Sequence, residues 1–174
     1  KLREEVPEIP LKNYLIEPMP KGTASVVGLA ATYLKKMDPD AVMAILTADH
    51  VMGNTGYFQE LLSNAKIIAQ QGFLVTLGIK PTFPAIGYGY IEAGEEITEF
   101  NCFHVKNFKE KPDLASAQAY LKSNSYFWNS GMFIWKATSI LSEFKQQMPQ
   151  LYGKLELINS RIKKDFTFAD IKDI

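Results

Sequence analysis

The chain has 174 residues, of which 47% are hydrophobic and 22% charged, a composition typical of a globular protein large enough to bury a core. Its 19 basic side chains balance its 19 acidic ones, so the charge predicts no binding to nucleic acid or to a membrane surface. The single cysteine, Cys102, excludes an internal disulfide and agrees with a reducing compartment. No apolar run reaches the roughly 20 residues of a membrane span, and we expect a cytoplasmic protein.

Apolar runs typical of strands alternate with segments of helical periodicity, which predicts an α/β fold. A short apolar run ends at Ile16, before Glu17 and Pro18, and indicates a strand end there. The unbroken apolar runs suit buried strands of a parallel sheet that is covered on both faces. The expected strands are 41–46, 73–79, 103–108 and 127–135, with a hairpin region before Asn101. The expected helices are 23–37 with Thr23 as N-cap, 56–71, a helix capped by Asp113 that reaches Lys122, 137–148 and 151–164.

Asp49 follows the first long apolar run, in the segment Thr47-Ala48-Asp49-His50. Open α/β sheets place ligand-binding groups at the carboxyl ends of their strands. A carboxylate there can bind Mg²⁺, which keeps waters and substrate phosphates around it and needs few protein ligands. Spacing alone favours equally a role in which Asp49 caps the next turn. His50 has no His or Cys partner nearby, so we expect it to be held by local hydrogen bonds rather than to bind zinc.

Two glycine-containing segments could approach a ligand through their backbones. The turn EPMPKGTA (17–24) joins a strand end to a helix start, and Gly22 permits close contact with a flat base or a phosphate. A plain strand–helix connection is the alternative and, from the residues alone, the favoured one. GYGYI (87–91) lacks the third glycine and the helix of a dinucleotide fingerprint, so it is more typical of a strand edge or bulge.

Polar side chains also lie at the end of one expected strand and within another. Glu110 could accept protons from sugar hydroxyls and Lys111 could neutralise a phosphate, although an exposed ion pair beside a turn is the simpler alternative. Asn129 interrupts the aromatic strand 127–135. A buried Asn needs hydrogen-bond partners, which either a polyhydroxylated ligand or the backbone can supply. Two histidines and one cysteine are too few to argue a Ser-His-Asp or Cys-His arrangement.

Taken in order, five segments resemble the mannose-1-phosphate guanylyltransferases, a family of sugar nucleotidyltransferases. The similar segments are EPMPKGTASVVGLAA (17–31), DPDAVMAILTADH (38–50), GFLVTLGIKPTFPAIGYGYI (72–91), FKEKPD (108–113) and YFWNSGMFIW (126–135). They keep the family's order and spacing over nearly the whole chain. The resemblance implies a three-layer Rossmann-like α/β sheet of the glycosyltransferase-A type, with helices on both faces and incomplete here at both ends.

The same resemblance implies a reaction and its residues. The family joins GTP to mannose 1-phosphate with Mg²⁺ as cofactor and releases pyrophosphate. Asp49 is similar to the family's metal ligand and Lys111 to the residue that faces the sugar phosphate, so both are expected to be catalytic. The expected guanine contacts are Glu17, Gly22, Thr23 and Ala24, and the expected sugar contacts are Gly89, Glu110 and Asn129.

The chain also departs from the family's pattern. Many members have Arg-Asn-Thr-Ala-Pro where this chain has Lys-Gly-Thr-Ala-Ser (21–25), and a lysine cannot make the planar two-point contact of an arginine. The family's glycine-rich triphosphate loop has no counterpart before Glu17, and its second acidic metal ligand is expected about where the chain ends. We therefore expect 1–174 to be a partial nucleotidyltransferase domain, inactive by itself, whose open sheet edge favours a homo-oligomer.

Two other functions stay open. One is a related nucleotidyltransferase that uses another base or sugar, which competition among GTP, ATP, UTP and dTTP would separate. The other is a non-catalytic binding module that kept the fold after losing the triphosphate loop, which the upstream coding sequence would reveal.

Overall fold

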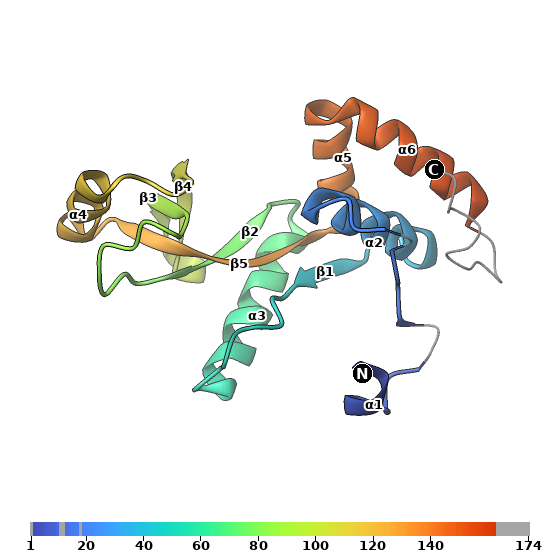
Figure 1. The fold of residues 1–174 in the computed structure, drawn as a ribbon, viewed down its shortest axis with the longest axis horizontal. Coiled ribbons are helices and arrows are strands. Elements are labelled where there is room, and N and C mark those ends of the chain that lie inside the picture. Colours follow the sequence, from blue (N-terminus) through green and yellow to red (C-terminus); the bar gives the residue numbers. More distant parts are fainter. Residues whose placement is uncertain (1, 11–12, 18, 163–174) are drawn as a thin grey trace. The chain divides into compact units, whose positions relative to one another are not determined.

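The computed structural model describes residues 2–10, 13–17 and 19–162. The chain divides into two compact units (Figure 1). A helical unit comprises Lys1–Ala41 and Ala137–Ile174, and a sheet unit comprises Val42–Lys136. No helix in the described residues is both long enough and apolar enough to cross a membrane.

Most of the expected elements are present, with bounds that agree to within three residues. The sheet unit contains, in chain order, β1 (Val42–Ile45), α3 (Thr55–Gln70), β2 (Val75–Ile79), β3 (Tyr90–Ile97), a 3-10 turn (Thr98–Phe100), β4 (Cys102–Lys109), α4 (Leu114–Ser123) and β5 (Tyr126–Lys136). The helical unit contains α1 (Leu2–Glu5), α2 (Thr23–Met37), α5 (Ala137–Gln147) and α6 (Pro149–Arg161). The expected α/β class is confirmed.

Strand β5 lies at the centre of the sheet, in the order β1-β5-β3-β4, with β2 also paired to β5. Ile134 of β5 is opposite Ala44 of β1 on one side and opposite Val75 of β2 on the other. Every pairing is antiparallel, so the expectation of a parallel sheet was wrong. Strands β1 and β2, joined through α3, do run in the same direction. However, β5 lies between them and runs in the opposite direction.

Helices α3 and α4 pack against side chains of even-numbered β5 residues, which are buried from Trp128 to Ile134. Ala65 and Ala69 of α3 pack on Ile134, together with apolar side chains of β1 and β2. Ala117 of α4 is fully buried in a second cluster with Trp128, Tyr90 and Ala85. Small alanines let both helices come close to the strand, and the aromatic and branched β5 side chains fill the space between them.

In the helical unit, α2 packs against both α5 and α6. Gly28 of α2 permits this close approach, because a Cβ there would lie 2.7 Å from the Cδ1 of Leu155 in α6. The Thr32 hydroxyl donates to the Gly28 carbonyl oxygen at 2.8 Å, so this buried polar group is satisfied within α2. The other buried apolar side chains of this unit, among the described residues, are Val27, Leu29, Ala31, Ala137, Ile140, Leu141, Phe144, Ile158 and Ile162.

Three local expectations were wrong. Residues 14–17 form no strand. The N-cap of α2 is Gly22, with a φ of 91°, and Thr23 is the first helical residue. The last helix begins at Pro149 rather than at residue 151, since proline suits the first turn, where no N–H is needed. The expected end of that helix, at residues 163–164, lies outside the described residues.

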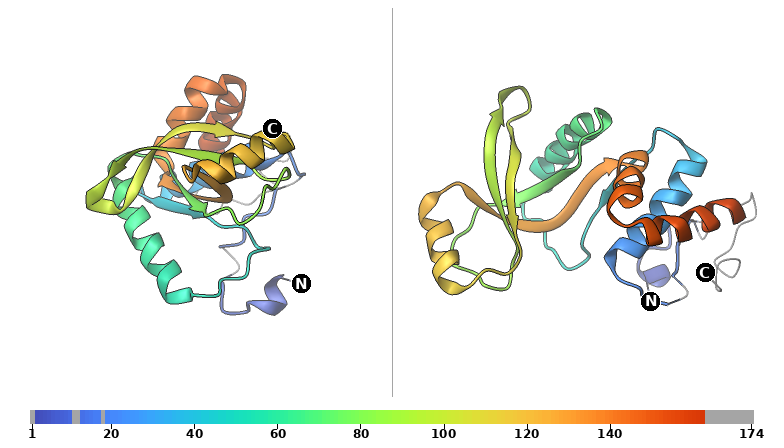
Figure 2. Two further views of the ribbon diagram at one scale, coloured as in Figure 1. Left: turned by 90° about the vertical axis from the view of Figure 1, so that its left-hand side faces the viewer. Right: turned by 90° about the horizontal axis from the view of Figure 1, so that it is seen from above.

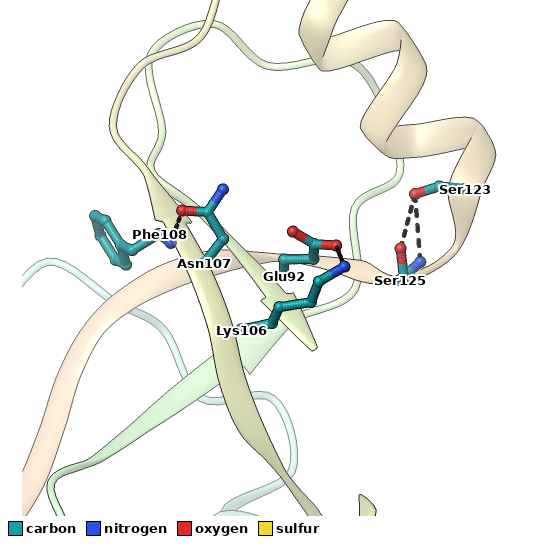
Figure 3. Close-up of polar contacts among 6 residues, drawn as sticks. All are labelled: Glu92, Lys106, Asn107, Phe108, Ser123 and Ser125. Carbon is teal, nitrogen blue, oxygen red and sulfur yellow. Dashed lines mark hydrogen bonds and ion pairs between the residues drawn. The ribbon is translucent and has the colours of Figure 1, made fainter. Parts of the chain in front are cut away.

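Strands β3 and β4 form a long two-stranded hairpin (Figure 2), and β4 is its outer strand. Lys106 of β4 donates from Nζ to Glu92 Oε1 of β3 at 2.7 Å across the hairpin (Figure 3). The hydrogen bond from Lys106 is the main reason that the pKa of Glu92 lies below its ordinary value. A charged outer strand also discourages pairing with another chain.

Gly78 of β2 faces Phe127 of β5, and a Cβ on Gly78 would lie only 2.8 Å from the Phe127 Cβ. That carbon is anchored to the β5 backbone, so the strands themselves would have to move. We expect Gly78→Ala to lower the free energy of unfolding by about 1–3 kcal/mol, measured by urea titration. Gly56→Ala in the first turn of α3, where the nearest atom is 3.8 Å away, is the control. Equal losses in the two variants would contradict the close contact.

Asp113 is the N-cap of α4, as expected, and its Oδ1 accepts the Ser116 N–H at 2.7 Å. This backbone hydrogen bond is the main reason that the pKa of Asp113 is below its ordinary value. A carboxyl with a lowered pKa stabilises the fold above its unfolded-state pKa, and this contribution is lost as the pH falls through the folded-state pKa.

We therefore expect Asp113→Asn to match the parent near neutral pH, because an asparagine can also cap a helix. Between about pH 5 and about pH 2 the variant should lose less stability than the parent. Asp113→Ala should be less stable than both at neutral pH. Chemical denaturation at several pH values measures the three proteins, and identical pH profiles would exclude this cap as a source of pH dependence.

Candidate functional site

Gly89, Glu110 and Asn129, the three expected sugar contacts, come together where β3 begins and β4 ends, beside β5. Tyr90 is paired with Lys109, which brings Gly89 and Glu110 opposite each other. The Asn129 N–H donates to the Gly89 carbonyl oxygen at 2.8 Å. A Cβ on Gly89 would lie 2.7 Å from Glu110 Oε2 and 3.5 Å from the Asn129 Cβ. The Glu110 carboxylate, the Phe108 ring and the Asn129 side chain therefore lie close to the backbone of Gly89.

A bulge in β5 holds the Asn129 side chain. Between neighbouring paired positions β2 advances two residues, from Thr76 to Gly78, whereas β5 covers four, from Phe133 to Asn129. Gly131 lies in this bulge with a φ of 73°, which favours glycine. Asn129 Oδ1 accepts hydrogen bonds from the Gly131 N–H and from the Thr76 hydroxyl, both at 3.2 Å. The protein itself thus satisfies the oxygen of this half-buried amide.

Thr76 was not among the residues predicted from the sequence. It lies in β2, in a run expected to be a buried apolar strand, and it is separated from Asn129 by 53 positions. Its only local signal is that it is a polar residue among apolar ones. That signal does not indicate a partner, because β2 and β5 become neighbours only in the folded sheet.

Asp49 lies in the turn that follows β1, and its side chain is 87% exposed. Its Oδ1 is 3.3 Å from Nδ1 of His50, and the same nitrogen hydrogen-bonds with the Thr47 hydroxyl. This agrees with the expectation that His50 is held locally. Thr47 in turn contacts the β5 bulge, since its Cγ2 is 3.3 Å from where a Cβ on Gly131 would lie. The next helix, α3, is capped by Asn54.

Lys111 follows Glu110 at the end of β4, and both side chains are exposed. Among the ion pairs of the described residues there is none between Glu110 and Lys111. The exposed ion pair that was the simpler alternative for these two residues is therefore not found. Lys111 has a φ of 41°, in the left-handed region that residues other than glycine seldom adopt. Backbone strain of this kind is concentrated at binding and catalytic sites.

Glu17, Gly22, Thr23 and Ala24, the four expected base contacts, belong to the helical unit, whereas the other candidate residues belong to the sheet unit. Gly22 begins α2 without a side-chain cap, and its carbonyl oxygen accepts the Ser25 N–H at 3.1 Å. Thr23 is exposed, while Glu17 and Ala24 are half-buried. The start of α2 thus presents backbone N–H groups and no acidic side chain in its first turn, as an anion-binding helix start requires.

No group of three or more His, Cys, Asp or Glu side chains that could hold a metal ion is found among residues 2–10, 13–17 and 19–162. Mg²⁺ does not need such a group when it is bound by one or two carboxylates, waters and substrate phosphates. The exposed Asp49 carboxylate at a strand end is a donor that fits this mode of binding.

Comparison with known proteins finds that the sequence profile described as "Nucleotidyl transferase" matches residues 4–173. A putative mannose-1-phosphate guanylyltransferase of Vibrio cholerae is 41% identical over 157 residues, which are 90% of this chain and 34% of that protein. A mannose-1-phosphate guanylyltransferase of Escherichia coli K12 is 38% identical over 167 residues, or 93% of this chain and 35% of that protein. The chain therefore spans about a third of the length of these relatives.

Two solved structures have a similar fold. One is described as a mannose-1-phosphate geranyltransferase from Thermus thermophilus, with a TM-score of 0.78 and 28% identity, covering 91% of this chain and 45% of that one. The other is described as a mannose-6-phosphate isomerase from Helicobacter pylori, with a TM-score of 0.79 and 28% identity, covering 99% of this chain and 68% of that one.

The close approach at Gly89 can be tested directly. In Gly89→Ala the added methyl group would overlap the Glu110 carboxylate, which lies at the end of a flexible side chain and can move. We expect a displaced Glu110 in the crystal structure of the variant and little change in its unfolding midpoint. Gly87→Ala, where nothing lies within 4 Å, should leave Glu110 in place. An unmoved carboxylate in Gly89→Ala would contradict this geometry.

Proposed function

Because the chain belongs to the nucleotidyl transferase family, we propose that its protein joins mannose 1-phosphate to GTP in the cytoplasm, forming GDP-mannose and pyrophosphate. The observation that carries the proposal is the convergence of Gly89, Glu110 and Asn129 from three separate segments. Relatives about 40% identical and named for this reaction cover about 90% of the chain, which supports the choice of substrates.

The proposed sugar site combines an acceptor with a donor. The Glu110 carboxylate can accept a hydrogen bond from one hydroxyl group, and the Asn129 amide can donate to another. Neighbouring hydroxyls of a sugar supply this pair of partners. Gly89 has no side chain, which lets the Glu110 carboxylate and the Phe108 ring lie close to its backbone. Lys111, one residue from Glu110, would bring a positive charge to the phosphate of the same sugar.

In the proposed nucleotide site, guanine and its ribose contact Glu17 and the start of α2 at Gly22, Thr23 and Ala24. The Glu17 carboxylate can accept hydrogen bonds from the N1–H and N2–H groups of guanine, which adenine does not offer. Gly22 allows the base to approach the backbone closely. Lys21 makes only single-point contacts, so selectivity for guanine would depend mainly on Glu17.

The reaction needs positioning more than covalent help. A phosphate oxygen of mannose 1-phosphate forms a bond to the α-phosphorus of GTP, while the bond between that phosphorus and the α–β bridging oxygen breaks. The electron pair leaves with pyrophosphate. Gly89, Glu110 and Asn129 would hold the sugar, and Lys111 would offset charge on its phosphate. Mg²⁺, held by Asp49, would neutralise the crowded phosphates when bound.

The proposal is tested by measuring pyrophosphate release from the full-length gene product with mannose 1-phosphate and GTP. ATP, UTP and dTTP, and glucose 1-phosphate as the sugar, are the competing substrates. Preferential use of GTP and mannose 1-phosphate is the expected result. Faster reaction with another pair would identify a related nucleotidyltransferase, and no release with any pair would favour a binding module.

Asp49→Asn should lower turnover by about two orders of magnitude or more, because it removes the proposed metal-binding charge. The side chain is exposed, so the thermal unfolding midpoint should change little. Glu95→Gln, a charge-removing change at an exposed position of β3, is the matched control and should retain turnover. Full activity of Asp49→Asn, or loss of its folding, would count against a metal at this position.

A further inference from the structure

The orientation of the Asn129 carboxamide follows from its neighbours. The atom that receives the Gly131 N–H at 3.2 Å must be an acceptor, because a backbone N–H can only donate. That atom is therefore the oxygen, Oδ1. The Thr76 hydroxyl lies 3.2 Å from the same oxygen and also 3.2 Å from the Met132 carbonyl oxygen. Both oxygens are acceptors and the hydroxyl has one proton, so Thr76 shares this proton between the amide and the backbone on the far side of the bulge.

The other end of the amide is left to donate. Among the hydrogen bonds of the described residues, none involves Asn129 Nδ2, although Oδ1 receives two. The nitrogen belongs to a half-buried side chain whose Cβ lies 3.5 Å from where a Cβ on Gly89 would be, and the same built atom would lie 2.7 Å from Glu110 Oε2. With its oxygen held, the amide can offer only N–H groups to a ligand, which complements the acceptor oxygens of Glu110.

We propose that Thr76 is a positioning residue that holds the Asn129 carboxamide with its NH2 group toward a ligand hydroxyl. This inference rests on the proposed function, since it assigns the ligand as the sugar phosphate of that reaction. Thr76 does not touch the sugar in this proposal. It keeps the amide from turning over, a rotation that would present the oxygen to the ligand and leave the Gly131 N–H without its acceptor.

Thr76 is suited to this role by its place in the sheet. It pairs with Phe133, on the far side of the bulge from Asn129, and so reaches across the irregular part of β5. A bulge interrupts the regular ladder of backbone hydrogen bonds between two strands. A hydroxyl that reaches across the bulge replaces part of this hydrogen bonding. Val75 and Leu77, its neighbours in β2, pack in the apolar cluster beneath α3, so Thr76 lies on the opposite face of the strand.

The test compares Thr76→Val, which removes the hydroxyl at nearly constant shape, with Thr76→Ser, which keeps it. In the full-length gene product, Thr76→Val should raise the KM for mannose 1-phosphate about threefold to tenfold, the effect expected for one hydrogen bond. The KM for GTP and kcat should change less than about twofold. Thr76→Ser should restore the KM. Thr32→Val, which removes a buried hydroxyl bonded to a carbonyl in α2, is the matched control and should leave the KM for mannose 1-phosphate unchanged.

A double-mutant cycle with Asn129→Ala distinguishes positioning from a general loss of stability. If Thr76 acts through Asn129, Thr76→Val should have no further effect on the KM once the amide is absent. Additive effects in the two backgrounds, or a failure of Thr76→Ser to rescue, would overturn the inference. When Asn129→Ala turns over too slowly, calorimetric binding of mannose 1-phosphate supplies the same cycle.

A second readout does not depend on activity. The side-chain NH2 resonances of Asn129 in the NMR spectrum should shift and exchange faster in Thr76→Val, and should return in Thr76→Ser. Unchanged resonances would overturn the positioning role while leaving the proposed function intact. The Asn129 resonances could instead respond as expected while no pair of sugar 1-phosphate and nucleotide reacts. In that case the proposed function fails, and with it the assignment of a sugar hydroxyl as the partner of the Asn129 amide.

Discussion

The sheet unit depends on the backbone hydrogen bonds of β5. Strands β1, β2 and β3 each pair with β5, and β4 reaches it only through β3. Both helices of this unit pack on the side chains that β5 buries, α3 on Ile134 and α4 on Trp128. A single strand thus organises two apolar clusters and three ladders. Any change that bends or shifts β5 is transmitted to all the strands beside it, because close-packed interiors leave little room for adjustment.

The bulge in β5 links the central strand of the sheet to the candidate site. The pairing of β5 with β2 is interrupted between Phe133 and Asn129, and within this interruption the Gly131 N–H donates to the Asn129 Oδ1. The bulge supplies that N–H and also brings Thr47, in the segment that leads to Asp49, against Gly131. Bulges beside functional sites re-aim side chains in this way. The proposed sugar and metal groups are therefore tied to one local feature of the backbone.

The elements that could be predicted were those with a strong local signal. Helix α2 was expected at 23–37 and is observed at Thr23–Met37, because apolar side chains recur there at helical spacing and a proline follows. The Asp113 cap was expected because an aspartate before a helix has a suitable side chain to receive a free N–H. The direction of β5 was missed, since an apolar strand buried in an antiparallel sheet looks the same in sequence as one in a parallel sheet. The strand expected at Ile16 was also wrong, because a short apolar run has no defined partner.

The sequence by itself determined the order of strands and helices from Thr23 onward, the family resemblance, and which polar residues stand out from apolar surroundings. Only the tertiary structure decided that Gly89, Glu110 and Asn129 meet, and that Thr76 holds the last of them. The reason is that helical periodicity and caps arise from neighbours a few residues apart, whereas strand pairing joins residues that may be separated by 50 positions or more, as for Thr76 and Asn129. The register of that pairing is set by how the buried faces of the strands pack. A bulge shifts this register, and no local sequence pattern reveals where the bulge lies.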